Sequence, residues 1–222
     1  MSRPITIAML SLLFTLCAEA VASAQQFDIS SGGQPTISGT LGGSITGSSS
    51  VLNDLTVTIN FGEVSPANTN SIVYVVVPIT VRSTKPYQVT AAVTGPSNAN
   101  AQALQASDIG FGAGNMRALG ANSQVCNNSS HIFYAPFNND PSTTVAIGAN
   151  GRATYQSTLA NIAGSTTILS GPRLSKTGQA NRRTDNGYVF DAMFAITPQF
   201  FAAGASSATL TFTISAGPNV SC

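Results

Sequence analysis

The chain has 222 residues, of which 43% are hydrophobic and only 8% are charged, and its formal net charge at pH 7 is +1. This apolar content is too high for a disordered chain, and the near-neutral charge gives no long-range attraction to nucleic acid or to an anionic membrane. A chain of this length is expected to form one domain with its own hydrophobic core.

The first 24 residues have the three parts of a secretory signal peptide in the correct order. Arg3 supplies an early positive charge, 5–17 is an apolar run, and Ala22-Ser23-Ala24 is a small-x-small cleavage site. The run is shorter than the about 20 residues of a membrane-spanning helix, and no later stretch reaches that length. We predict a cleaved signal peptide at 1–24, export through the periplasm, a secreted or cell-surface location, and no transmembrane segment.

The start of the mature chain allows two interpretations. The stretch 25–34 is polar and contains glycine, so we expect a flexible leader, and the β-sandwich domain is predicted to span 35–222. In 36–46 the apolar residues Ile37, Leu41 and Ile45 share one face of an extended chain. This segment is either a donor strand that fills the groove of a neighbouring copy or the first strand of its own domain.

The central stretch 71–94 is the most apolar part of the mature chain. Residues 72–81 are apolar on both faces, a polar break follows at 82–85, and a period of two resumes after Pro86. We predict a hairpin of two core strands. Pro78 cannot donate to a ladder, so we place a β-bulge there.

Shorter alternating stretches predict most of the remaining strands. Asn150-Gly151 suits a type I′ turn, because both of its residues tolerate positive φ, and it predicts a hairpin between its flanking strands. The stretch 101–107 has modest helix propensity but is too short to be stable alone. We predict an all-β protein, a single immunoglobulin-like antiparallel β-sandwich of about nine or ten strands with little helix; the further predicted strands are 36–46, 55–61, 109–112, 131–134, 143–149, 152–159, 166–169, 188–196 and 208–215.

Two cysteines remain after the signal peptide, which contains Cys17, is removed. Cys126 and Cys222 form an even pair in an oxidising compartment, so we predict one disulfide bond between them. Closing this loop of about 96 residues would contribute on the order of 4–5 kcal/mol in the chain-entropy model. The alternative is an intermolecular bond from Cys222.

The chemistry-bearing residues do not form a catalytic motif. His131 is the single histidine, and we interpret it as a partly buried structural residue. No cluster of residues has the spacing of metal ligands, and the mature carboxylates are scattered along the sequence. We therefore expect no enzyme activity, no metal and no cofactor; the carboxylates are Asp28, Asp54, Glu63, Asp108, Asp140, Asp185 and Asp191.

Four of the basic residues gather in the polar stretch 171–187. Arg173, Lys176, Arg182 and Arg183 make this stretch the strongest candidate for a surface patch. Such a patch would suit an anionic polysaccharide or the acidic face of a partner. The alternative is a solvated loop without a ligand.

Three features resemble a known class of proteins. The run Phe61-Gly62-Glu63-Val64-Ser65-Pro66 after a strand, the alternating segment 36–46 and the alternating last strand 208–215 are similar to those of exported bacterial β-sandwich subunits of surface appendages, namely chaperone–usher pilins and related secreted coat proteins. This resemblance implies a structural subunit that polymerises by donor-strand exchange, with help from an export chaperone.

Two functions therefore stand as expectations. The first is a secreted or cell-surface, pilus-like or coat subunit that assembles into homo-oligomers or polymers. The second is a monomeric extracellular module for carbohydrate binding or adhesion, in which Tyr134, Tyr155 or Tyr188 would serve as sugar platforms. The absence of tryptophan counts against the second function.

Overall fold

The computed structural model describes residues 26–39, 42–51, 53–66, 72–96, 100, 102–119, 130–148, 153–174, 187–202 and 207–221, with the backbone alone at 48–51. The predicted signal peptide at 1–24 lies outside these residues. No helix in the described part of the chain has the length and apolarity of a membrane span.

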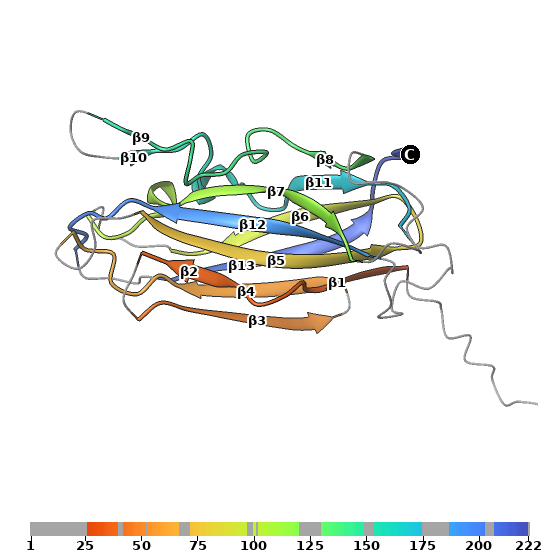
Figure 1. The fold of residues 1–222 in the computed structure, drawn as a ribbon, viewed down its shortest axis with the longest axis horizontal. Coiled ribbons are helices and arrows are strands. Elements are labelled where there is room, and N and C mark those ends of the chain that lie inside the picture. Colours follow the sequence, from red (N-terminus) through yellow and green to blue (C-terminus); the bar gives the residue numbers. More distant parts are fainter. Residues whose placement is uncertain are drawn as a thin grey trace, which may run out of the picture.

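The described residues form an antiparallel β-sandwich (Figure 1), as the sequence predicts. One sheet has the order β1-β5-β12-β7, with β2 also paired to β5, and the other has the order β3-β4-β13-β6-β11-β8; β9 and β10 form a separate pair. In the part of the chain that the structure describes, helical structure is limited to 3-10 turns such as η1 (Ala106–Asp108) and η3 (Leu159–Asn161). The strands are β1 (Phe27–Ser31), β2 (Thr36–Ser38), β3 (Ser44–Val51), β4 (Asp54–Asn60), β5 (Val73–Ser83), β6 (Tyr87–Thr94), β7 (Gly110–Ala118), β8 (Ile132–Phe133), β9 (Ala146–Ile147), β10 (Ala153–Thr154), β11 (Thr166–Gly171), β12 (Tyr188–Ile196) and β13 (Ser207–Ala216).

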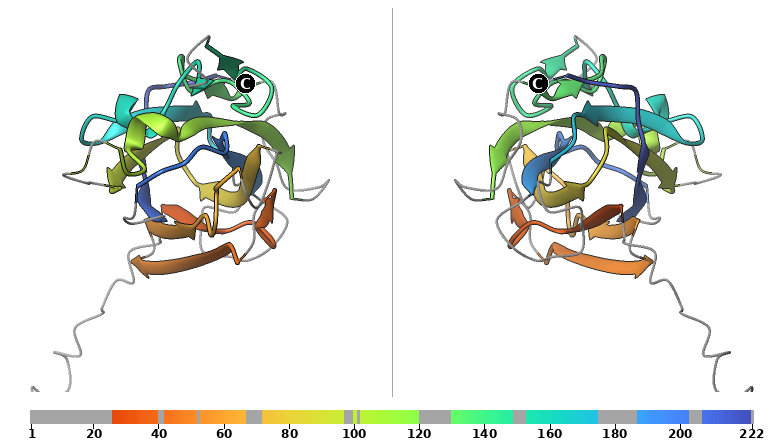
Figure 2. Two further views of the ribbon diagram at one scale, coloured as in Figure 1. Left: turned by 90° about the vertical axis from the view of Figure 1, so that its left-hand side faces the viewer. Right: turned by 90° about the vertical axis from the view of Figure 1, so that its right-hand side faces the viewer.

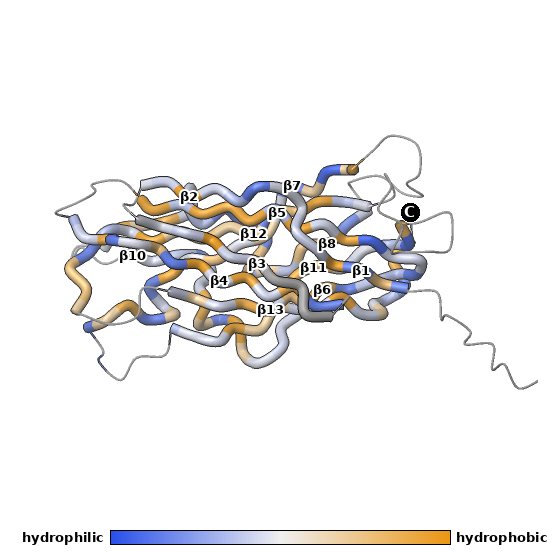
Figure 3. Tube along the Cα trace, turned by 90° about the horizontal axis from the view of Figure 1, so that it is seen from below, coloured by the Kyte–Doolittle hydropathy of each residue, from blue (hydrophilic) through white to orange (hydrophobic). Residues whose placement is uncertain are grey.

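The core lies between the two sheets and is built from alternate residues of their strands. Leu210, Phe212 and Ile214 of β13 are almost fully buried, whereas the residues between them are partly exposed. The tube in Figure 3 shows this change between apolar and polar residues along the strands. The period of two that predicted these strands is therefore the pattern of residues that face the core.

The prediction of a hairpin in the central stretch is wrong in one respect. Both strands exist, but β5 belongs to the five-stranded sheet and β6 to the six-stranded sheet. Thr84–Pro86 therefore carries the chain from one sheet to the other. The alternation identifies both strands as core strands, but it contains no information on which strands are their neighbours.

The bulge predicted at Pro78 is also absent. Pro78 faces Asp191 in a ladder between β5 and β12 that has no register shift. The Pro78 carbonyl accepts a hydrogen bond from the Gly32 N–H at 2.8 Å, and the nitrogen and oxygen of one residue point to the same side of an antiparallel strand. The nitrogen of Pro78, which has no hydrogen to donate, therefore faces the connection between β1 and β2, where the ladder is already interrupted.

The leader is ordered where the sequence predicted a flexible segment. Phe27–Ser31 forms β1, which pairs with β5 over five residues, and Ile29 is fully buried. The prediction failed because β1 is short and polar in composition, so its structure depends on the neighbouring strand. Of the hairpin predicted around Asn150-Gly151, the pairing of the flanking strands is confirmed in a shorter form, since β9 pairs with β10. The predicted turn itself lies outside the described residues.

Candidate functional site: the seam at the N-terminal edge

The N-terminal strands form one side of the sandwich, where both sheets end. β1 and β2 are the edge of the five-stranded sheet, and β3 is the edge of the six-stranded sheet. The end-on views of Figure 2 show these segments together on one side of the molecule. We call the gap between β1–β2 and β3 the seam.

β1 is attached to the protein through β5 by several kinds of contact. Its five residues run in register with β5, and the Thr84 N–H donates to the Gln26 carbonyl at 2.9 Å. On the outer face, Arg82 forms an ion pair with its cross-strand partner Asp28 at 3.0 Å, and the two side chains are only 10% and 14% exposed. The Arg82 guanidinium also donates to the Ser30 hydroxyl at 3.4 Å. Removing one member of such a buried ion pair is strongly destabilising, because the remaining charge stays buried without a counterion.

A pocket of about 140 Å³ lies in the seam. It is lined by Ser31, Pro35, Ile45, Gly47, Leu55, Val57 and Val77. The lining therefore comes from the β1–β2 connection, from β3 and β4, and from β5. Its apolar members make it a place where an aliphatic side chain would be removed from water.

Two interruptions of the strand pattern create this pocket. Between β1 and β2 the chain leaves the ladder, so Val77 has no cross-strand neighbour on that side. Across the seam, Gly47 pairs with the inward-facing Val57, and a Cβ added to Gly47 would meet no atom within 4 Å. The position beside Val57 in the pocket lining therefore has no side chain.

The edges of the two sheets differ in how they are protected against added strands. At the edge strand β7, Arg117 forms an ion pair with Asp191 at 2.8 Å, and its side chain is 47% exposed. A charged residue at an edge opposes pairing with another chain. β3 has the sequence SITGSSSV, without charge or proline. The seam thus borders an edge strand that lacks this protection.

The predicted donor residues do not share one strand. Ile37 lies in β2 and pairs with Val75, whereas Ile45 lies in β3 of the other sheet and pairs with Ile59. Gly39 has a φ of +78° and separates the two strands. Leu41 lies outside the described residues. The prediction of one alternating strand across 36–46 is therefore wrong.

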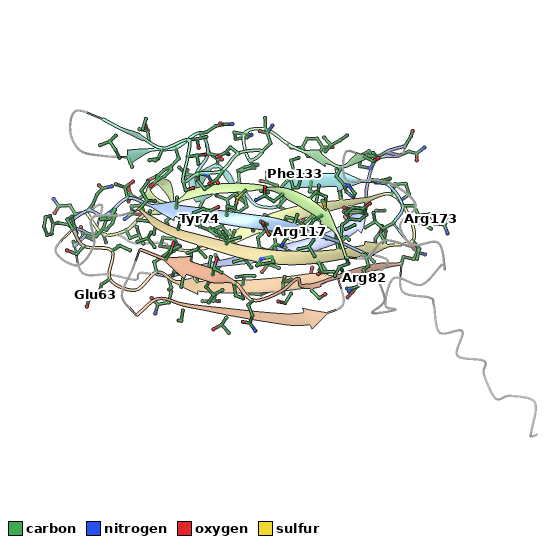
Figure 4. The ribbon with its side chains drawn as sticks, in the orientation of Figure 1. Glu63, Tyr74, Arg82, Arg117, Phe133 and Arg173 are labelled. Atoms are coloured by element: carbon green, nitrogen blue, oxygen red, sulfur yellow. The ribbon has the colours of Figure 1, made fainter. Side chains whose placement is uncertain are left out.

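The other predicted sites can be placed only in part. Arg173 is exposed just after β11, at the end of the sandwich opposite Glu63 (Figure 4). Lys176, Arg182 and Arg183 lie outside the described residues, and so do both cysteines of the predicted disulfide, Cys126 and Cys222.

The aromatic residues proposed as sugar platforms point mainly into the protein. Tyr188 is 1% exposed, and its ring centroid lies 4.6 Å from that of the buried His131. The Tyr134 hydroxyl lies 3.0 Å from the Ser170 hydroxyl, and the Tyr155 hydroxyl lies 3.1 Å from the Thr197 hydroxyl. Burial raises the pKa of Tyr188 and of Tyr155 above their ordinary value. Tyr188 is therefore a core residue, whereas Tyr134 and Tyr155 are half-buried.

Polar side chains also form hydrogen bonds on the outer face of the five-stranded sheet. The Tyr74 hydroxyl donates to the Asp140 carboxylate at 3.4 Å, and burial, aided by that carboxylate, raises the pKa of Tyr74 to about 12. Asn115, at a positive φ of 55°, donates to Asp191 at 3.3 Å. Within the described residues, no three side chains of the histidine, cysteine or carboxylate type converge as metal ligands.

Sequence reasoning missed the contacts that hold β1 against β5. Asp28 and Arg82 are 54 positions apart, and nothing in either local sequence indicates that they pair. The one available signal was the alternation of Phe27 and Ile29 within the polar leader. The fold defines the chain as an antiparallel β-sandwich protein. No protein-family model matches it, and neither the curated proteins nor the solved structures include a significant match.

Proposed function

We propose that this chain is an exported, non-enzymatic structural subunit that assembles into a pilus-like or coat polymer by exchanging its N-terminal strands. The observation that carries the proposal is the position of β1 and β2. They form an edge of the sandwich, they pair with β5 alone, and they border a pocket beside an uncharged edge strand.

An edge strand near a chain end can leave its sheet at a lower free-energy cost than an internal strand. Cleavage after Ala24 would place β1 two residues from the mature N-terminus. Releasing β1–β2 breaks hydrogen bonds to one neighbour only, whereas β13 is held between β4 and β6. If β1–β2 of one copy then occupies β5 of the next copy, the same contacts form again between chains, as in domain swapping.

The contacts of β1 make this exchange slow and specific. Ile29 must leave the core, and Asp28 must leave the buried Arg82 charge, before either can bind a neighbour. An export chaperone that lends a strand to β5 would lower this barrier by edge pairing. The low net charge of the chain favours association between copies.

The predicted disulfide between Cys126 and Cys222 belongs to this proposal as an internal bond. Figures 1 and 2 show the C-terminal end beside β8, which begins six residues after Cys126. An intramolecular bond would attach the C-terminal end to the sandwich, and polymer growth would then depend on strand exchange alone.

The proposal is tested on mature protein from the secreted or surface fraction by gel electrophoresis with and without boiling and reduction. We expect a ladder of multiples of the monomer that collapses on boiling but not on reduction. A ladder that collapses on reduction alone would indicate bonds through Cys222, and a monomer under every condition would contradict assembly.

A further inference from the structure

The ion pair between β1 and β5 joins two residues that are each the single charge of their segment. Asp28 is the one charged residue between positions 25 and 53, and Arg82 is the one charged residue of β5. The ladder places them directly opposite each other, with 3.0 Å between a guanidinium nitrogen and a carboxylate oxygen. No other residue of 25–53 can therefore supply Arg82 with an opposite charge.

The surroundings of Arg82 hold its charge at the edge of β5. Gly187 leaves the space that the Arg82 stem occupies, since a Cβ added to Gly187 would lie 2.9 Å from Arg82 Cγ. The guanidinium contacts the Asp28 carboxylate and the Ser30 hydroxyl, and within the described residues its Nε is buried without a hydrogen-bond partner. Because the side chain is only 10% exposed, it requires a counterion from whichever strand occupies this edge.

The apolar residues of β1 do not fix its register by themselves. Phe27 and Ile29 lie on the same face of the strand and pack against the core, where Ile29 is fully buried. A shift by two residues keeps each face of the strand where it was, so Phe27 takes the place of Ile29 or moves beyond it. The same shift puts Gln26 or Ser30 opposite Arg82 and leaves the guanidinium without a counterion. The ion pair therefore separates registers that the apolar pattern leaves similar.

From these observations we propose that Arg82 selects the strand that pairs with this edge of β5. The edge accepts an extended segment with an acidic residue opposite Arg82, followed by an apolar residue that faces the core. The inference rests on the proposed function, because strand exchange opens this edge to another chain. The occupant is β1 of a second copy, in which Asp28 and Ile29 have these two roles. Fixing the register of a partner is the best-attested role of buried ionic groups.

Other strands of the chain do not meet this requirement. β2, β3 and β13 are uncharged, so any of them beside Arg82 would leave a buried guanidinium unpaired. An uncompensated buried charge is strongly destabilising. These strands should therefore bind the edge more weakly than β1 does, and exchange should insert β1 in one register.

The test measures the binding of a fluorescently labelled peptide of residues 25–31, QQFDISS, to full-length mature proteins by fluorescence anisotropy. In the Asp28→Lys protein and in the Arg82→Glu protein, β1 no longer matches its own edge and competes poorly with a peptide. We expect the Asp28→Lys protein to bind the native peptide about tenfold or more tightly than a peptide carrying Asp28→Lys. The Arg82→Glu protein should show the reverse preference, because its edge now requires a positive charge.

Two controls separate the contact from net charge and from damage to the fold. Lys85→Glu makes the same change in charge as Arg82→Glu, at an exposed position in the connection after β5. It should exclude both peptides, as the wild-type protein does, because its β1 stays in place. The Asp28→Lys/Arg82→Glu double variant has an ion pair with exchanged charges. It should also exclude both peptides and should unfold at a higher temperature than either single variant.

The same two single variants test selection between copies. The β1 strand of each variant is mismatched with its own β5 edge but matched with the edge of the other variant. We expect neither variant to form a boiling-sensitive ladder alone, whereas an equal mixture of the two should form one.

The outcomes distinguish this inference from the proposed function. Equal binding of the two peptides, the same preference in both proteins, or no binding of either peptide would overturn the inference, whether or not the wild-type protein assembles. Single variants that form ladders as extensive as those of the wild-type protein would also overturn it. If the proposed function alone fails, the peptide preference reverses as expected while the wild-type protein forms no boiling-sensitive ladder.

Discussion

Filling the seam pocket should stabilise the sandwich, and Gly47 is the position from which to fill it. It lines the pocket opposite Val57 without a side chain, and an added Cβ has free space. A cavity costs about 24 cal/mol per Å³, so complete filling of the 140 Å³ would contribute about 3 kcal/mol. The pocket is open on one side, and Gly47→Val fills only part of it. We therefore expect a gain of about 1.5 kcal/mol.

This gain corresponds to a rise in Tm of about 3–6 °C for a domain of this size. Urea unfolding, followed by circular dichroism, should give the same change in free energy without a change in slope. The matched control is Ser44→Val, which places valine on the outer face of the same strand, at an exposed position opposite Asn60. It should gain only the strand propensity of valine, a few tenths of a kcal/mol. A Gly47→Val protein no more stable than Ser44→Val would refute the assignment of the pocket as an unfilled core position.

Three further predictions test the other features of the structure. Asp28→Asn should cost about 3 kcal/mol and speed the release of β1, because Arg82 keeps a buried charge without its counterion; protection of β1 amides from hydrogen exchange measures this, and equal protection in both proteins would contradict it. The pKa values of Tyr74, Tyr87, Tyr155 and Tyr188 are all raised by burial, to about 12 for Tyr74, so the folded state holds these protons longer than the unfolded state. The stability that these tyrosines contribute should therefore be constant well below pH 10 and should fall as the pH rises through about 10 to about 12; Tyr74→Phe should reduce this loss, and an unchanged alkaline profile would count against it. Finally, thiol titration of the denatured mature protein should find no free cysteine, and peptide mapping should find Cys126 joined to Cys222 of the same chain; free thiols would contradict the predicted bond.

The strands were predictable because their signal is local. In β4 and β13 the side chains that alternate in the sequence are those that alternate between the core and the outer face. The low helix content of the described residues is also consistent with this pattern. These features depend only on neighbours within a few residues.

The partners of the strands were not predictable in the same way. β5 and β6 are adjacent in sequence and apolar, yet they lie in different sheets. The polar leader becomes a strand because β5 offers it an edge and Arg82 offers Asp28 a counterion. The pocket depends on Gly47, which has no side chain to fill it. The sequence alone does not reveal this pocket, because the rest of its lining comes from other strands, including β5 of the opposite sheet.

The most direct test of the account is to lock β1 in its own domain. Ser30 and Thr80 are cross-strand partners, and such pairs have Cα separations of about 4.5–5.5 Å, within the range of a disulfide bond. The mature S30C/T80C protein should stay free of boiling-sensitive polymers when oxidised and should form them after reduction. A polymer ladder of equal extent in the oxidised protein would show that assembly does not require β1 to leave β5, and it would contradict the exchange proposed here.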